Sequence, residues 1–212
     1  MVLDRRIEFF HMPNSRSGGT FVLLEELKAP FDLHVRYGEQ TREPAYLAIN
    51  PMGKVPAIRH QGQLISEQGA IFIYLADLFP EAGLAPPIGD VLRGPYLRWL
   101  VYYGSSFEPA VIDFALKREA APPRMCPYGD YDTMLKVVVD QLGKGPYLLG
   151  DRFSAADILW GTALGWTTSF KVVPELPEIM AYVERIAARP ASQKIRAKDA
   201  ELAAAGPVQP AS

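Results

Sequence analysis

The chain has 212 residues, of which 49% are hydrophobic and 22% charged, and its 22 basic and 24 acidic side chains give a formal net charge of −2. This length and composition are typical of a soluble globular protein with a packed core, in one large domain or two small ones. Because no stripe of basic residues interleaves with aromatic ones, the composition argues against nucleic acid as a partner.

Cysteine and histidine usage limits the redox and metal chemistry. Cys126 is the single cysteine, which excludes an internal disulfide, and it has no metal-ligand spacing with His11, His34 and His60. We therefore expect no metal and a reducing compartment. Charged residues at 4–6 argue against a signal peptide, and no 18 apolar residues run together, so we expect a cytoplasmic protein without membrane contact.

The first 80 residues combine strand and helix patterns. In chain order the predicted elements are a strand at 7–10, a helix at 20–27, strands at 33–37, 54–59 and 63–65, and a helix at 66–78. The first three form a β-α-β unit, and the two short strands join through a hairpin turn at 60–62. For the last helix, Ser66 is the candidate N-cap.

Long helical patterns follow a segment rich in proline and glycine. Residues 81–89 read as a linker. The later patterns cover 92–115, 128–142, 154–168 and 178–188, and the alanine-rich tail after Ala200 is expected to fray. The predicted domains are therefore 1–80, and 90–212 as an all-helical domain.

One helix start has a recognisable cap. Ser154 is predicted as the N-cap and Asp157 occupies the third helical position, as in a capping box with Asp in place of Glu. Phe153 and Ile158 are spaced to form a hydrophobic staple around it.

Two segments of the first domain have functional potential. Residues 50–58 (NPMGKVPAI) combine a Pro-Gly turn with a short strand in which Pro56 lacks a backbone donor. Residues 67–71 (EQGAI) begin a helix, where free N–H groups and the helix dipole favour a carboxylate. Glu67 at this position is able to pair with an ammonium group.

In this order and spacing, the two segments resemble the glutathione-binding part of the glutathione transferases, and residues 150–158 match a helix-starting signature of the same family. The resemblance runs from about 7 to 198 and is to cytosolic, bacterial-like members related to the serine type. It implies an α/β thioredoxin-like N-terminal domain, an all-α C-terminal domain and a homodimer.

The resemblance implies glutathione as co-substrate and a cis Val55–Pro56 bond that turns the Val55 N–H and C=O outward to pair with it. It also implies that Lys54 meets the glycyl carboxylate and that Glu67 and Gln68 bind the γ-glutamyl end. Gln68 stands where the family usually has serine, but its amide is still a donor. We refer to Lys54, Val55, Pro56, Glu67 and Gln68 as the cradle residues.

The family places its thiol-activating residue just after the first strand, here in residues 12–20. A hydrogen-bond donor there stabilises a thiolate. The candidates are Ser15, then Asn14 through its amide, and then Ser17, which is the better candidate for a helix cap. Simple capping and turning is the ordinary explanation for such a loop. Residues 12–20 contain neither tyrosine nor cysteine, which disfavours tyrosine-type and cysteine-type enzymes.

A second substrate is expected in a pocket lined by Tyr103 and Phe107, which favours an apolar acceptor. The leading hypothesis is a glutathione S-transferase that conjugates the glutathione thiolate to an apolar electrophile, a detoxification reaction. One alternative is a glutathione-dependent disulfide-bond oxidoreductase. Another is a non-catalytic binding or assembly module on the same fold, for which Gly18-Gly19 and Gln68 are the sequence support.

Overall fold

The computed structural model describes residues 4–207, which form two compact units. The first unit contains residues 4–82 together with 189–207, and the second contains residues 83–188. The C-terminal helix thus belongs with the N-terminal residues, whereas the sequence prediction assigned 90–212 to one domain. No helix within the described part of the chain has the length and apolar character needed to span a membrane.

A four-stranded mixed sheet forms the centre of the first unit. Its strands are β1 (Ile7–His11), β2 (Phe31–Val35), β3 (Ala57–His60) and β4 (Gln63–Ile65), in the order β2-β1-β3-β4. β1 pairs in parallel with β2 and antiparallel with β3, and β3 pairs antiparallel with β4. This topology confirms the predicted thioredoxin-like fold. β2 begins and ends two residues before the predicted strand, because Tyr37 already precedes a 3₁₀ helix at Gly38–Arg42.

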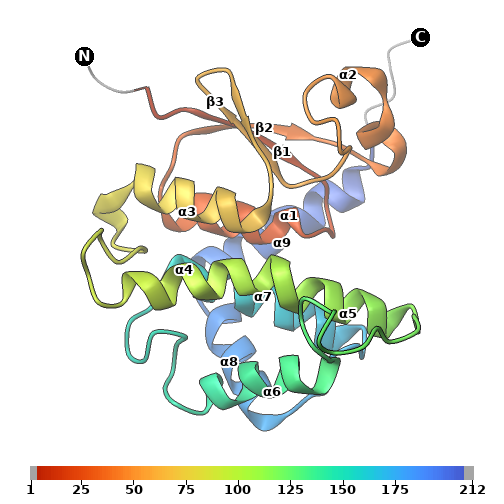
Figure 1. Ribbon diagram of the computed structural model, residues 1–212. Coiled ribbons are helices and arrows are strands. Elements are labelled where there is room, and N and C mark those ends of the chain that lie inside the picture. The colour runs from red at the N-terminus through yellow and green to blue at the C-terminus, as the bar shows by residue number, and fades with distance from the viewer. Residues whose placement is uncertain (1–3, 208–212) are drawn as a thin grey trace. The chain divides into compact units, whose positions relative to one another are not determined.

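Helices pack on the sheet of the first unit. They are α1 (Ser17–Glu26), the short α2 (Pro44–Leu47), α3 (Gln68–Leu78), a 3₁₀ turn at Pro80–Ala82, and α9 (Pro190–Ala205). α1 and α3 lie on one face of the sheet, and α9 lies along α1 (Figure 1). Phe9, Leu23, Ile71 and Leu75 have no exposed surface and form the core between these layers.

Helix α9 corrects the sequence prediction, which expected the chain to fray after residue 200. Pro190 occupies the first helical position, where its fixed φ suits a helix start, and the following Ala, Lys, Arg and Glu residues are strong helix formers. Arg189 beside α9 pairs with Glu26 of α1 at 2.6 Å, and Lys194 pairs with Glu25 at 2.7 Å. Residues 208–212 of the predicted tail lie outside the described residues.

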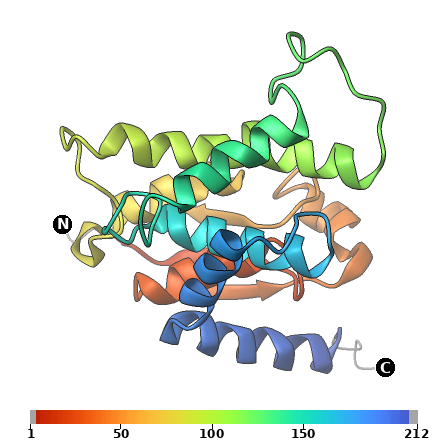
Figure 2. The same ribbon diagram turned by 90° about the horizontal axis from the view of Figure 1, so that it is seen from below.

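The second unit is all-helical, as predicted. Its helices are α4 (Arg93–Tyr102), a π-helical segment (Tyr103–Phe107), α5 (Glu108–Ala115), α6 (Tyr131–Leu142), α7 (Ala155–Ser169) and α8 (Pro177–Ala187). The first three make up the helix predicted at 92–115. The connection between α5 and α6 projects away from the helices (Figure 2) and exposes Leu116 and Met125.

The predicted capping box at α7 is confirmed. One carboxylate oxygen of the buried Asp157 accepts hydrogen bonds from the N–H and the hydroxyl of Ser154, at 2.8 and 2.9 Å. The other accepts the Leu148 N–H at 2.8 Å and the Tyr182 hydroxyl at 2.9 Å. The cap therefore also joins α7 to α8 and to the segment that precedes it.

We expect Gly161→Ala to destabilise the protein, because an added Cβ would lie 2.6 Å from three side-chain carbons of Ile186 on α8. Overpacking of this kind lowers the free energy of unfolding by about 1–3 kcal/mol. Gly165→Ala, one turn along α7, is the matched control, since its Cβ would lie 3.5 Å from Val183. It should be neutral or stabilise the helix by up to about 1 kcal/mol. Urea denaturation measures both, and equal stability of the two variants would contradict the close packing of α7 on α8.

Candidate functional site

Three segments of the first unit converge at one edge of the sheet. β1 runs antiparallel to β3 with Phe10 opposite Ala57, so the residues that follow β1 lie beside those that precede β3. β4 returns along β3 with Ile65 opposite Ile58, which brings the start of α3 to the same edge. The converging segments are residues 12–16, 54–56 and 66–68.

The turn before β3 fixes the backbone that leads into Pro56. The Gly53 N–H donates to the Asn50 C=O at 2.8 Å. Gly53 has φ +59°, and a Cβ there would lie 2.8 Å from a carbonyl oxygen, so the turn requires glycine. The buried Asn50 amide and the Tyr46 hydroxyl both donate to the Lys54 C=O, at 2.8 and 2.7 Å. Two side chains therefore hold the peptide that precedes Val55.

The Val55–Pro56 peptide bond is cis, as the resemblance implied. Within residues 4–207, the Val55 N–H and C=O have no hydrogen-bond partner. Val55 is partly exposed and Pro56 is buried, while the side chain of Lys54 is exposed. The main chain at Val55 is therefore available to pair with an extended ligand.

Glu67 has an unusual backbone conformation at the start of α3. It is the N-cap, with φ 65° and ψ 118°, and the helix begins at Gln68, so the prediction of Ser66 as the N-cap was wrong by one residue. Strained conformations of this kind concentrate at functional sites. The exposed Glu67 side chain stands at the positive end of the helix, and Gln68 Nε2 donates to the Arg16 C=O at 3.0 Å. This hydrogen bond links α3 to residues 12–16.

Arg16 is the N-cap of α1 and makes no side-chain capping hydrogen bond, so Ser17 is not the cap, and Ser15 precedes it. The Ser17 N–H donates to Ser15 Oγ at 3.2 Å, and the Gly18 N–H donates to the Ser15 C=O at 3.0 Å. Ser15 Oγ also lies 2.7 Å from both the Met12 C=O and Ser17 Oγ. Ser15 is partly exposed, whereas Ser17 is buried as the first residue of α1. The expectation that Ser17 caps the helix is corrected, because its hydroxyl turns inward.

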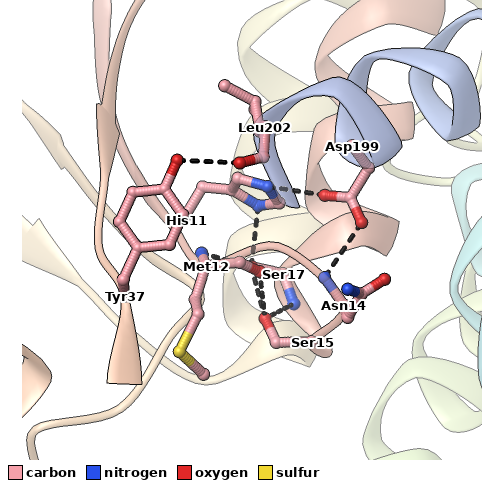
Figure 3. A network of polar contacts seen from close by, with 8 residues as sticks. All are labelled: His11, Met12, Asn14, Ser15, Ser17, Tyr37, Asp199 and Leu202. Carbon is pink, nitrogen blue, oxygen red and sulfur yellow. Dashed lines mark hydrogen bonds and ion pairs between the residues drawn. The ribbon is translucent and has the colours of Figure 1, made fainter. Parts of the chain in front are cut away.

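A buried histidine and an aspartate lie behind these serines (Figure 3). His11 has no exposed surface, and its Nδ1 lies 2.8 Å from Ser17 Oγ. Its Nε2 lies 2.7 Å from Asp199 Oδ1, and neither of these atoms has another hydrogen-bond partner among the described residues. The other oxygen, Asp199 Oδ2, accepts the Asn14 N–H at 2.9 Å. Asp199 thus connects α9 both to β1 and to residues 12–16.

Asp199 is held as a carboxylate. Burial acts to raise the pKa of Asp199, but its contact with His11 and the hydrogen bond from the Asn14 N–H outweigh burial and lower the pKa below its ordinary value. A carboxylate can only accept hydrogen bonds, which assigns a proton to Nε2 of His11. In the neutral imidazole, Nδ1 is then the acceptor for the Ser17 hydroxyl.

Asn14 lies on the outer side of this network. It is exposed and adopts a left-handed conformation with φ 55°. Its backbone N–H binds Asp199, while its side chain points away from the Ser15 hydroxyl (Figure 3). The two leading candidates for thiol activation therefore differ. The Ser15 hydroxyl is hydrogen-bonded within the network, whereas the side-chain amide of Asn14 is not part of it.

The aromatic pair predicted to line an acceptor pocket is buried. Tyr103 and Phe107 are 2% and 0% exposed, and their rings lie 6.0 and 4.9 Å from that of Trp160. These contacts are those of core side chains, and the pocket role stays a prediction. A hollow of about 610 Å³ in the second unit is lined by other residues, including Trp99 and Lys144.

Within residues 4–207, no group of three or more His, Cys, Asp or Glu side chains is arranged to hold a metal ion. Cys126 is a free thiol in the second unit and is partly exposed.

The sequence reasoning missed His11 and Asp199 as parts of the site. Strand alternation carried a usable signal for His11, since Ile7, Phe9 and His11 share the face that is fully buried. Asp199 had no local signal, because the Asn14 N–H that it binds is 185 residues away.

Comparison with known proteins fits this geometry. The family model for the glutathione S-transferase N-terminal domain matches residues 15–78, and the model for the C-terminal domain matches residues 129–190. Glutathione S-transferase GstA of Escherichia coli O157:H7 is 30% identical over 194 residues, which cover 88% of this chain and 96% of the relative. The chain belongs to the glutathione transferase family.

Solved glutathione transferases share the fold. The glutathione transferase of Methylococcus capsulatus has a TM-score of 0.77 and 32% identity, covering 92% of this chain and 100% of the other. A sphingomonad glutathione S-transferase in complex with glutathione has a TM-score of 0.77 and 28% identity, with the same coverage. The predicted family and fold class of this chain are thus confirmed.

The lowered pKa of Asp199 predicts a pH-dependent contribution to stability. A carboxyl group whose pKa is lower in the folded state stabilises the fold fully above its ordinary pKa of about 3.9, and the contribution is lost as the pH falls through the folded value. Urea unfolding should therefore show Asp199→Asn to be less stable than wild type at pH 7, with the difference shrinking below about pH 4.

Asp140→Asn removes the carboxylate of an exposed ion pair with Lys136 and is the control. It should change the stability little at either pH. A difference between wild type and Asp199→Asn that stays constant from neutral to acidic pH would contradict the lowered pKa.

Proposed function

We propose that this protein is a glutathione S-transferase, which binds glutathione through the cradle residues, stabilises its thiolate at Ser15 and adds the thiolate to an apolar electrophile. One observation carries the proposal. An unpaired Val55 main chain, the strained Glu67 at the start of α3 and the loop with Ser15 converge at the same edge of the sheet.

Each part of glutathione has a matching group. The Val55 N–H and C=O pair with the cysteinyl main chain as a neighbouring strand would. The N-terminus of α3 attracts the γ-glutamyl carboxylate, and Glu67 pairs with the ammonium group beside it. Lys54 meets the glycyl carboxylate. Support also comes from the related sphingomonad enzyme, which was solved in complex with glutathione.

Ser15 is suited to stabilise the thiolate. Lowering a thiol pKa by about two units requires about 2.7 kcal/mol of differential stabilisation. A hydrogen bond from a hydroxyl to a charged acceptor contributes roughly 1.5–3 kcal/mol, and the N-terminal amides of α1 add to the favourable field. Binding both reactants in one site raises the rate further by proximity. The acceptor is proposed to be a small apolar electrophile, and the active form a homodimer.

Glutathione should stabilise the protein against heat. A ligand at about 100 times its dissociation constant adds roughly 2.7 kcal/mol, which raises the midpoint of thermal unfolding by several degrees for a chain of this size. Glu67→Gln should reduce the rise, because it removes the partner of the ammonium group.

Glu178→Gln makes the same change in the first turn of α8 and is the control, which should keep the full rise. No rise in the wild type at millimolar glutathione would overturn the transferase proposal and favour a non-catalytic module. Turnover of a small disulfide in place of an electrophile would favour the oxidoreductase alternative.

Two substitutions separate the thiol-activating candidates. Ser15→Ala should raise the apparent thiol pKa of bound glutathione and lower kcat/KM by roughly ten- to a hundredfold, with a loss of about 1 kcal/mol of stability from the missing hydrogen bond with the Ser17 N–H. Asn14→Gly removes the amide, suits the positive φ and keeps the N–H that binds Asp199, so its activity should be near that of wild type. The reverse pattern would assign thiol activation to Asn14.

A further inference from the structure

The His11–Asp199 pair has no part in the proposed chemistry so far, yet it connects directly to Ser15. Three short contacts make this connection (Figure 3). Ser15 Oγ lies 2.7 Å from Ser17 Oγ, Ser17 Oγ lies 2.8 Å from His11 Nδ1, and His11 Nε2 lies 2.7 Å from Asp199 Oδ1. Burying an ionisable pair is costly and contributes little to stability by itself. An unbroken chain from a partly exposed hydroxyl to such a pair points to a role in proton movement.

We propose that His11 receives the thiol proton of bound glutathione through Ser15 and Ser17, and that Asp199 balances the charge which His11 gains. This inference rests on the proposed function, because it requires the sulfur of glutathione to meet the Ser15 hydroxyl. Of the four residues Ser15 alone touches the substrate. Ser17, His11 and Asp199 are positioning residues.

The proton transfer balances along the chain. The thiol proton moves to Ser15 Oγ, the Ser15 proton moves to Ser17 Oγ, and the Ser17 proton moves to Nδ1 of His11. Each hydroxyl oxygen gains one proton and loses one, so sulfur loses a proton and His11 becomes an imidazolium. No bond between heavy atoms changes. The resulting thiolate then accepts a hydrogen bond from Ser15.

The resting hydrogen bonds prepare this direction of transfer. The Asp199 carboxylate keeps a proton on Nε2, which leaves Nδ1 free to accept. The Met12 N–H donates to Ser17 Oγ at 3.1 Å and the Ser17 N–H donates to Ser15 Oγ at 3.2 Å, so both hydroxyl oxygens are held in place. In the absence of a ligand, the Ser15 hydroxyl donates a hydrogen bond to the Met12 C=O at 2.7 Å.

The surroundings of His11 favour a charge there only because of Asp199. The imidazole packs against Phe9 and Phe21, with ring centroids at 5.5 and 5.1 Å. α9 contributes Asp199 and α1 contributes Ser17. Among the described residues, neither β2 nor β3 brings another charged side chain into ion-pair contact with the ring. Attraction between opposite charges is strong in such an apolar setting, and an unpaired imidazolium would be unfavourable.

The test is a pH titration of bound thiolate, followed by its ultraviolet absorbance in the full-length protein saturated with glutathione. Asp199→Asn removes the counter-charge, while its amide oxygen can still accept the Asn14 N–H. It should raise the apparent pKa of the bound thiol by about one unit, which is the size expected from the loss of one nearby charge.

Tyr37→Phe is the matched control. It removes a 2.9 Å hydrogen bond from the Tyr37 hydroxyl to the Leu202 C=O on the same helix, without touching His11. It should leave the thiol pKa unchanged even where it lowers the melting temperature. A merely structural role of α9 would shift the thiol pKa equally in Tyr37→Phe and Asp199→Asn. That outcome overturns the proposed relay, the proton transfer from glutathione through Ser15 and Ser17 to His11.

A double variant tests whether Asp199 acts through Ser15. In Ser15→Ala the relay is already broken, so adding Asp199→Asn should produce no further shift in the thiol pKa. A full additional shift would show that Asp199 acts on the thiolate by another route and would overturn the inference. If the wild type itself shows no thiolate absorbance with glutathione, the proposed function is overturned as well. The wild-type titration therefore separates failure of the relay from failure of the proposed function.

A second measurement does not depend on the variants folding. Nitrogen-15 chemical shifts of labelled histidine report the proton on Nδ1 of His11. Addition of glutathione to the wild-type protein at neutral pH should convert His11 from a neutral to a doubly protonated ring, whereas His34 and His60 should not change. An unchanged His11 spectrum in protein that forms the thiolate would overturn the relay.

Discussion

The antiparallel pairing of β1 with β3 is the constraint on which the candidate site depends. With Phe10 opposite Ala57, the end of β1 and the start of β3 lie at the same edge of the sheet. The hydrogen bonds from Tyr46 and Asn50 to the Lys54 C=O fix the peptide that follows it. Slipping this register by one residue would turn the buried face of β1 outward, including His11. The main chain at Val55 is then a free strand edge of defined position, which is what an extended peptide ligand requires.

Helix α9 adds a carboxylate to the network that contains Ser15, Ser17 and His11. His11 lies in an apolar layer, where an ionisable ring needs a partner, and Asp199 is the partner. The same carboxylate binds the Asn14 N–H and so orders the loop that holds Ser15. Thus the Asp199 side chain links the packing of α9 to the protonation of His11 and to the loop at residues 12–16. The strand and loop segments alone do not supply this carboxylate.

Local patterns predicted most strands and helices of the fold. The segments at 50–58 and 67–71 carry their own turn and helix-start chemistry, and the family resemblance of these segments gave the cradle residues, whose roles stay predictions. The cap at Ser154 was predicted correctly, but those at Ser66 and Ser17 were not, because φ at Glu67 and the inward turn of the Ser17 hydroxyl depend on tertiary contacts. The contact between β1 and α9 could not be predicted from local patterns, since it joins opposite ends of the chain and α9 is polar on most of its surface.

The long separation between Asn14 and Asp199 has a consequence for biosynthesis. The strands and first helices leave the ribosome well before the last helix, and domains tend to fold as they emerge. Until α9 is synthesised, the imidazole at the end of β1 has no counter-ion and the loop after it has no anchor. The nascent first unit therefore has its sheet before it has the complete site, which requires Asp199 of α9. A chain that ends before this helix lacks the carboxylate that accepts the Asn14 N–H, and with it one anchor of the loop after β1.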